Sequence, residues 1–151
     1  TLTIFYLRGR STVTGDIFDI STPNLENLIL IDDLSLTNIT GNIGYLGSNF
    51  PNLKTFQIIG PQTITGNISG LPTTLESFIL NSSNSSLTGN WSSLSTHINL
   101  YQFVNLLGYS KITGNLSLLP SSVKVFNYET TDVLGMSTYT SGHIWANPMQ
   151  M

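Results

Sequence analysis

The sequence has no cysteine, which excludes a disulfide framework, a thiolate zinc site and a cysteine nucleophile. Charged residues are scarce too, at 9% of the 151 residues against roughly 25% in an average soluble protein. With only five Lys and Arg residues and a net charge of -3, we expect no phosphate-binding surface and no nucleic-acid partner. No apolar run approaches the roughly 18 residues of a membrane-spanning helix, so we expect no membrane span in this segment.

What the sequence does contain is an internal repeat. A motif of Thr, Gly, Asn or Asp, and an apolar residue occurs five times, at intervals of 26, 25, 23 and 25 residues. The copies begin at Thr14, Thr40, Thr65, Thr88 and Thr113. A second pattern follows each copy by 10 to 13 residues, with apolar residues at its first, fourth and sixth positions. Its members are Leu25/Leu28/Leu30, Leu53/Phe56/Ile58, Leu75/Phe78/Leu80, Ile98/Tyr101/Phe103 and Val123/Phe126/Tyr128, with Leu2/Phe5/Leu7 as a sixth set.

Each repeat is too short to bury its own apolar face, so neighbouring repeats must stack and share one core. The alternation between the fourth and sixth positions predicts a strand with one face inward. The residues that follow are rich in Asn, Ser and Gly and predict turns without a proper helix. The recurring Gly indicates a tight bend or a close approach of two repeats, and the Asn beside it is expected to bond to the backbone. The next apolar residue is expected to return the chain to the core, at Ile17, Ile43, Ile68, Trp91 and Leu116.

The strand pattern and its period resemble the leucine-rich repeat, and the resemblance extends from Leu2 to about Tyr128. Leu87-Thr88-Gly89-Asn90 is similar to the convex-side element of plant-type repeats, although the proline that follows the apolar residue there is absent here. The Thr-, Asn- and Ser-rich style is more similar to irregular repeats in surface proteins of gut Bacteroidetes and their phages. The resemblance implies a single β-rich solenoid of about six units, with short parallel strands on its concave face. Its convex turns would be irregular or 3₁₀, with little or no α-helix.

Neither end of the sequence has the pattern of a capping unit, which a solenoid needs to cover its core. Ser141-Gly142-His143-Ile144 aligns with the repeat motif, and the strand after it would begin at about Met151. We therefore expect the 151 residues to be a fragment, or the ordered part, of a longer repeat protein. The alternative is that the segment from Met136 to Met151 folds over the last repeat as an irregular cap.

Outward residues of stacked strands line up in columns on the concave face, because alternate residues point to the same side. We predict one column of Tyr6, Ile29, Gln57, Ile79, Gln102 and Asn127, and a second of Arg8, Ile31, Ile59, Asn81, Val104 and Glu129. Five aliphatic side chains would lie together there, and exposed apolar patches often mark binding surfaces. Alternatively, these residues are present because β-branched side chains favour strands, or because a further part of the full-length protein covers them. The candidate binding residues are Tyr6, Arg8, Ile29, Ile31, Gln57, Ile59, Ile79, Gln102 and Val104.

The residues that could carry chemistry are few and scattered. Asp16, Asp19, Asp32 and Asp33 lack the fixed alternation with Gly that a calcium-binding repeat requires, so no metal site is expected. His97 and His143 lie in different repeats and have no partner at the spacing of a metal ligand or a catalytic triad. There is no Gly-rich phosphate loop and no nucleophile motif, so we expect neither an enzyme nor a cofactor.

The sequence thus predicts a non-enzymatic recognition or structural module of a surface-exposed, extracellular protein. Its context would be a phage tail or virion appendage, or a bacterial cell surface. The expected partner of the concave face is a protein or a surface polysaccharide. The alternatives are an architectural spacer whose repeats bind no ligand of their own, and an accessory segment of an enzyme whose catalytic domain lies elsewhere in the full chain.

Overall fold

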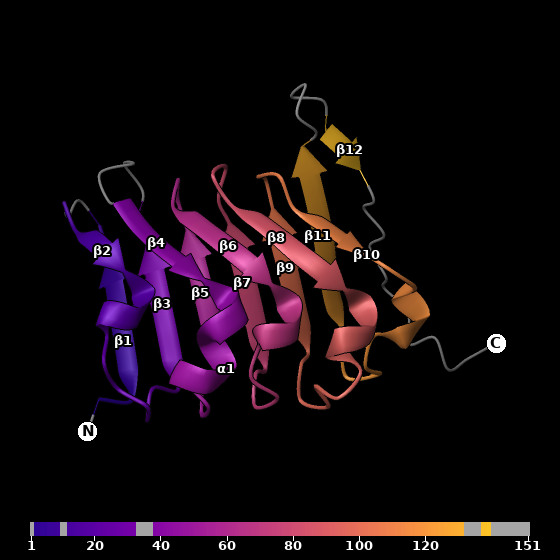
Figure 1. Ribbon diagram of the computed structural model, residues 1–151, viewed down its shortest axis with the longest axis horizontal. Helices are drawn as coiled ribbons and strands as arrows, with labels where there is room; N and C mark the ends of the chain where they lie inside the picture. Colours follow the sequence, from indigo (N-terminus) through magenta and orange to yellow (C-terminus); the bar gives the residue numbers. More distant parts are fainter. Residues whose placement is uncertain (1, 10–11, 33–37, 132–136, 140–151) are drawn as a thin grey trace.

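The computed structural model describes residues 2–9, 12–32, 38–131 and 137–139, and its strands form two layers (Figure 1). The first layer is a seven-stranded sheet in the order β1-β3-β5-β7-β9-β11-β12, and the second is a five-stranded sheet in the order β10-β8-β6-β4-β2. All pairings are parallel except that of β11 with β12. The first sheet consists of β1 (Ile4–Arg8), β3 (Asn27–Ile31), β5 (Thr55–Ile59), β7 (Ser77–Asn81), β9 (Gln102–Leu106), β11 (Val125–Thr131) and β12 (Ser137–Tyr139). The second consists of β2 (Thr14–Asp16), β4 (Asn38–Asn42), β6 (Thr63–Asn67), β8 (Ser86–Asn90) and β10 (Lys111–Thr113).

From β1 to β11, consecutive strands alternate between the two sheets, so the chain advances by one strand in each sheet with every repeat. We call a strand of the first sheet, the following strand of the second sheet and the turn after it a coil. The turns are the 3₁₀ segments η1 (Ile17–Asp19), η2 (Ile43–Tyr45), η3 (Ile68–Gly70), η4 (Trp91–Leu94) and η5 (Leu116–Leu118). The α-helix α1 (Leu46–Asn49) has four residues. Over the described residues the chain is therefore β-rich with little helix, as predicted.

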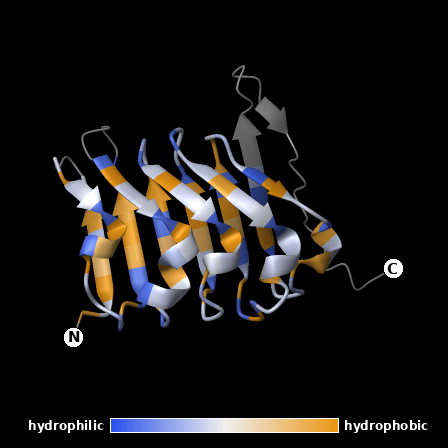
Figure 2. Cartoon of the chain, in the orientation of Figure 1, coloured by the Kyte–Doolittle hydropathy of each residue, from blue (hydrophilic) through white to orange (hydrophobic). Residues whose placement is uncertain are grey.

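The core lies between the layers and is built from the inward side chains of both sheets. The strands of both sheets carry hydrophobic residues (Figure 2). Phe56, Phe78, Phe103 and Phe126 come from successive strands of the first sheet and stack with centroid distances of 5.2, 4.9 and 6.0 Å. Trp91, the first residue of η4 after β8, meets Phe103 edge-on at 5.5 Å. The predicted inward sets Leu25/Leu28/Leu30, Leu53/Phe56/Ile58 and Leu75/Phe78/Leu80 are buried throughout.

The prediction for the fourth repeat was wrong by two residues. Ile98 is 73% exposed and Tyr101 is 47% exposed, so neither belongs to the core. The inward residues are Leu100, Phe103 and Asn105, because Phe103 pairs with Phe78 and Asn105 pairs with Leu80 across the sheet. The sixth position of this repeat is the buried Asn105. The pattern of apolar residues alone therefore places the repeat two residues too early.

The first and last predicted core positions are also exposed. Leu2 and Leu116 were expected to point inward, but they are 47% and 37% exposed. Leu2 precedes β1 and Leu116 follows β10, and both strands are edges of their sheets within the described part of the chain. No described coil precedes Leu2 and no described 3₁₀ segment follows that of Leu116, so each of these side chains is covered from one side only. Ile17 also follows an edge strand, β2, but it is covered because Gly41 of the next coil lies directly against its side chain. The other four return residues, Ile17, Ile43, Ile68 and Trp91, are buried as predicted.

The Thr-Gly-Asn motif, for which the sequence predicted only turns, forms strands of the second sheet. Of the two roles predicted for its glycine, the close approach of two repeats is confirmed at Gly66, which lies within β6 and not at a tight bend. Gly66 has φ +119°, and a Cβ there would collide with Asn42 of the preceding coil. The motif Asn side chains bond to the backbone, as predicted: the Oδ1 atoms of Asn42, Asn67, Asn90 and Asn115 each accept from the N–H two residues later, at 2.9 Å.

Replacing Asn67 with alanine is expected to lower the free energy of unfolding by about 1 kcal/mol, because the Ser69 N–H loses its acceptor. Asn67→Asp is the matched control, since Asp16 fills the same position in the first coil and its Oδ1 accepts from Phe18 N at 3.0 Å. Urea denaturation of both variants checks this. Equal stability of Asn67→Ala and the unmodified chain would show that this cap is not needed.

The segment from Met136 to Met151, which was considered as a cap, lies outside the described residues except for β12. The backbone of β12 pairs antiparallel with the end of β11, from Glu129 to Thr131.

Candidate functional site

The outward residues of the seven-stranded sheet form the candidate site, which we call the outer face. The strand register places them in three columns that run across the strands. The first column holds Ile4, Asn27, Thr55, Ser77, Gln102 and Val125. The second holds Tyr6, Ile29, Gln57, Ile79, Val104 and Asn127. The third holds Arg8, Ile31, Ile59, Asn81 and Leu106.

Two of the candidate residues occupy different columns from those predicted. Gln102 pairs with Ser77, which puts it in the first column rather than beside Ile79. Val104 takes the place predicted for Gln102 and pairs with Ile79. Both shifts follow from the two-residue error in the fourth repeat. The other candidates, Tyr6, Arg8, Ile29, Ile31, Gln57, Ile59 and Ile79, lie in the columns where they were expected.

The middle of the outer face carries a continuous group of aliphatic side chains, which we call the aliphatic patch. Ile31 pairs directly with Ile59, and Ile79 pairs directly with Val104. Ile59 and Ile79 are diagonal neighbours, within reach of each other across adjacent strands. The patch consists of Ile29, Ile31, Ile59, Ile79, Val104 and Leu106, all of them partly exposed. Leu106 was not predicted, because it enters the third column only in the corrected frame.

The patch has a polar border and carries no charge of its own. Outward positions of β3, β5, β7 and β9 hold no charged residue, and Arg8 stands at the end of the third column. The first column is polar over the same four strands, and the Ser77 hydroxyl donates to Gln102 Oε1 at 3.2 Å. Just before the strands, Lys54 Nζ lies 2.8 Å from Glu26 Oε2, and this contact raises the pKa of Lys54 above 10.5.

Asp16, Asp19, Asp32 and His97 take part in hydrogen bonds within the fold. Asp16 and Asp19 cap η1, where Asp19 Oδ2 accepts from Asp16 N at 2.9 Å. Asp32 is buried and accepts from Gln62 Nε2 at 3.4 Å. Over the described ranges, no group of three His, Cys, Asp or Glu residues could hold a metal ion. Asp33 and His143 lie outside those ranges.

His97 gives the chain a stability that depends on pH. It is 2% exposed, and its Nε2 lies 3.2 Å from Leu71 O. Its buried Nδ1 has no hydrogen-bond partner among the described residues, so a second proton there would be unsolvated. Loss of water lowers the pKa of His97 below 6.5, against smaller opposing effects of backbone hydrogen bonds.

We expect the free energy of unfolding to fall as the pH drops below 6.5, the ordinary pKa of histidine. The unfolded chain binds a proton at His97 near pH 6.5, whereas the folded chain resists protonation to a lower pH. The contribution is therefore complete above pH 6.5 and is lost as the pH falls through the folded pKa. Urea denaturation across this range checks it, with His97→Gln as the control that should flatten the curve. The same slope in both proteins would assign the effect to other groups.

Comparisons with protein-family models, with curated proteins and with solved structures found no match for this chain. Among the described residues, no helix is long and apolar enough to cross a membrane.

Proposed function

We propose that this chain is a non-enzymatic recognition module whose outer face binds a protein partner. The observation that carries the proposal is the aliphatic patch, in which the pairs Ile31–Ile59 and Ile79–Val104 meet across the strands. Contiguous apolar surface on a sheet face is characteristic of interaction sites. The regular pairing of parallel strands holds the patch on a rigid surface, so binding would need little reordering.

The architecture that we propose is a leucine-rich-repeat-type solenoid, with the outer face as its concave side. It is supported by the alternation of strands between two parallel sheets and by the one-strand advance with each repeat. The continuous stack of Phe56, Phe78, Phe103 and Phe126 supports it as well, because stacked repeats share one core.

A protein partner fits this surface better than a surface polysaccharide. The hydroxyl groups of a sugar chain would lose water against Ile31 and Ile59 without gaining hydrogen bonds in return. Only Tyr6, in the first strand, offers an aromatic ring in the three columns. An apolar protein surface, in contrast, would cover the aliphatic patch, and its polar rim could pair with Asn27, Thr55 and Gln102.

The low charge and the polar, uncharged residues between the apolar positions support a surface-exposed context. A phage tail or virion appendage, or a bacterial cell-surface protein, is the setting that we propose.

The test compares the unmodified chain with the triple variant Ile29→Thr, Ile59→Thr and Ile79→Thr. Threonine keeps the β-branched shape that strands favour, so the variant should fold while losing its apolar face. The control is Ile98→Thr, which removes an exposed isoleucine that lies outside the outer face. Circular dichroism and thermal unfolding establish that all three proteins are folded.

The probes are a phage-displayed library of random peptides and an array of surface glycans. We expect the selected peptides to be rich in apolar residues and to bind the Ile98→Thr control as well as the unmodified chain. Their affinity for the triple variant should fall at least tenfold, since about 1.4 kcal/mol of lost burial is enough for that change. Glycan binding that depends on the three isoleucines would instead indicate a polysaccharide. Equal peptide binding by the triple variant would remove the outer face as the site, and absence of any binding would favour an architectural spacer.

A further inference from the structure

Every boundary between coils repeats the same hydrogen-bonded interface. The carbonyl of the residue before each strand of the first sheet accepts from two N–H groups of the next coil. Thr3 O accepts from Glu26 and Asn27, and Glu26 O accepts from Lys54 and Thr55. The carbonyls of Lys54, Glu76 and Tyr101 repeat the arrangement. Ile4 pairs in register with Asn27, so the N–H groups of Thr3 and Ile4 are the equivalent donors of the first coil, and they face the β1 edge of the sheet.

A second contact recurs in the other sheet, where an asparagine of one coil occupies a notch above a glycine of the next. A Cβ at Gly89 would lie 2.6 Å from Asn67 Oδ1, and a Cβ at Gly114 would lie 2.5 Å from Asn90 Oδ1. Gly15 is the equivalent glycine of the first coil and has φ +141°. The nearest described atom to a Cβ at Gly15 is Asp19 Oδ2 of its own coil, at 3.0 Å, so no other coil of the described residues occupies this notch.

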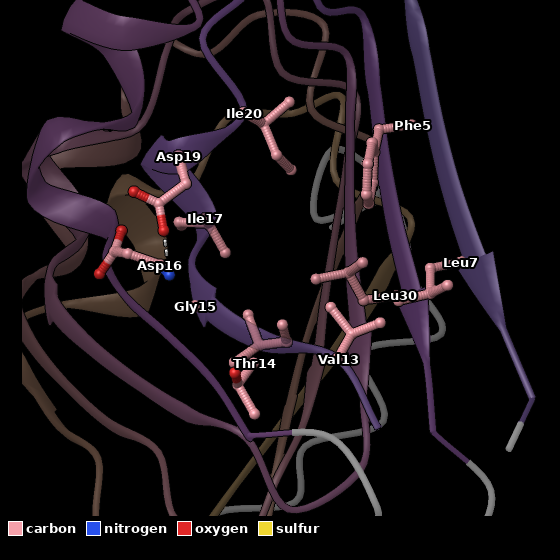
Figure 3. A pocket seen from close by; sticks show the side chains of 11 residues that line it. Phe5, Leu7, Val13, Thr14, Gly15, Asp16, Ile17, Asp19, Ile20 and Leu30 are labelled. Carbon is pink, nitrogen blue, oxygen red and sulfur yellow. Dashed lines mark hydrogen bonds between the residues drawn. The ribbon is translucent and has the colours of Figure 1, made fainter. Parts of the chain in front are cut away.

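The apolar interior is open at the same end. A cavity of about 160 Å³ lies between β1 and β2, and Figure 3 shows Phe5 and Leu30 on one side of it and Ile17 and Ile20 on the other. Its lining is predominantly apolar, and the side chains of Phe5 and Leu7 remain half-buried. Their equivalents two coils further on, Phe56 and Ile58, are fully buried because a coil lies on each side of them.

We propose that the N-terminal end of the two sheets is a docking surface for one further coil of the same class. The occupant would provide a carbonyl for the N–H groups of Thr3 and Ile4, and an asparagine for the notch at Gly15. Its inward apolar side chains would close the cavity. The chain already forms this interface between each pair of its own coils. A further coil is therefore the partner whose backbone and side chains match this surface.

A second copy meeting this end through its own N-terminal end does not satisfy the same requirements. The interface joins two unlike halves, one with carbonyl acceptors and an asparagine, the other with N–H donors and a glycine notch. If two N-terminal ends met, the N–H donors of Thr3 and Ile4 would face the same donors of the other copy. The notch at Gly15 would face another such notch, with no asparagine to fill either of them. At the opposite edge of the first sheet, β12 pairs with the last three residues of β11, from Glu129 to Thr131.

The experiment extends the full chain before Thr1 with a copy of residues 52–73, which carry β5, β6 and Asn67 and end in register with Thr1. The matched control carries the same added residues in scrambled order. Amide hydrogen exchange of Thr3 and Ile4, followed by NMR, is the main measurement, and thermal unfolding is the second. We expect exchange at both amides to slow at least tenfold and Tm to rise in the extended chain, with neither change in the control.

A synthetic peptide of residues 52–73, titrated into the unmodified chain, keeps the test informative if the extension disturbs folding. We expect it to shift the amide signals of Thr3, Ile4 and Gly15. Unchanged exchange in a folded extended chain, or no shift with the peptide, would overturn the proposal. Sedimentation that shows the unmodified chain to be a dimer, with Thr3 and Ile4 already protected, would overturn it in favour of a second copy.

Discussion

Replacing Phe78 with alanine is expected to lower the free energy of unfolding by about 3–5 kcal/mol. Phe78 is fully buried, and its ring stacks between Phe56 at 5.2 Å and Phe103 at 4.9 Å. The alanine variant loses the burial of the ring and leaves a cavity in the middle of the stack. The neighbouring rings cannot close this cavity, because the strand register fixes the coils on both sides. Denaturant unfolding followed by circular dichroism measures the loss.

Tyr101→Ala is the control for this prediction. Tyr101 is aromatic and lies just before a strand, but it is 47% exposed. Its removal should change the free energy of unfolding by no more than about 0.5 kcal/mol, as for most surface substitutions. A similar loss in both variants would contradict the assignment of the fourth repeat, in which Phe103 is inward and Tyr101 is not.

The second large effect is expected from Gly66→Ala. Gly66 has φ +119°, and a Cβ there would collide with Asn42 Oδ1 and lie 2.8 Å from Gly44 N. Backbone strain costs about 1–3 kcal/mol, and forcing the two coils apart costs about 1–3 kcal/mol more. We therefore expect a total loss of about 2–6 kcal/mol in the free energy of unfolding.

Gly9→Ala separates the two contributions. Gly9 has nearly the same backbone conformation, with φ +114°, but a Cβ there meets nothing within 4 Å. This variant should show the strain alone, about 1–3 kcal/mol. If both variants lose the same amount in urea denaturation, the close approach of the coils at Gly66 contributes nothing to stability.

The repeat period and the apolar pattern were enough to predict the six parallel strands of the first sheet, with β9 placed two residues too early, but the antiparallel strand β12 was not predicted. Residues such as Leu28, Phe56 and Leu80 are inward because they alternate with polar or β-branched neighbours, and burial of one face follows from that alternation. The bonding role of Asn67 and the close approach at Gly66 were also predicted, because both follow from the local chemistry of these residues.

The second sheet could not be predicted in the same way. Its strands contain Thr, Gly and Asn, and the last two are poor strand formers. They become strands because the adjacent coils present matching backbone groups on both sides, as in the pairing of Thr65 with Ser86. This strand pairing depends on the neighbouring repeats, so the sequence of a single repeat does not predict it.

Two of the three columns of the outer face were predicted, with errors at the fourth repeat, and the column that begins at Ile4 was not predicted. Asn105 is fully buried at the sixth position, so the apolar pattern alone aligned Phe103 with the wrong neighbours. The error moved Gln102 and Val104 to the wrong columns and hid Leu106. The identity of a partner was not predictable, because a patch of aliphatic side chains defines a kind of surface and not a single ligand.

The measurement that tests the central claim most directly is isoleucine methyl NMR of the chain with a peptide selected from the library. The chain carries internal controls for position: Ile29, Ile31, Ile59 and Ile79 lie on the outer face, Ile43 and Ile68 lie in the core, and Ile98 is exposed elsewhere. We predict that the peptide shifts the methyl signals of the four isoleucines of the aliphatic patch and leaves those of Ile43, Ile68 and Ile98 in place. Shifts at Ile98 with an unchanged outer face would contradict the account.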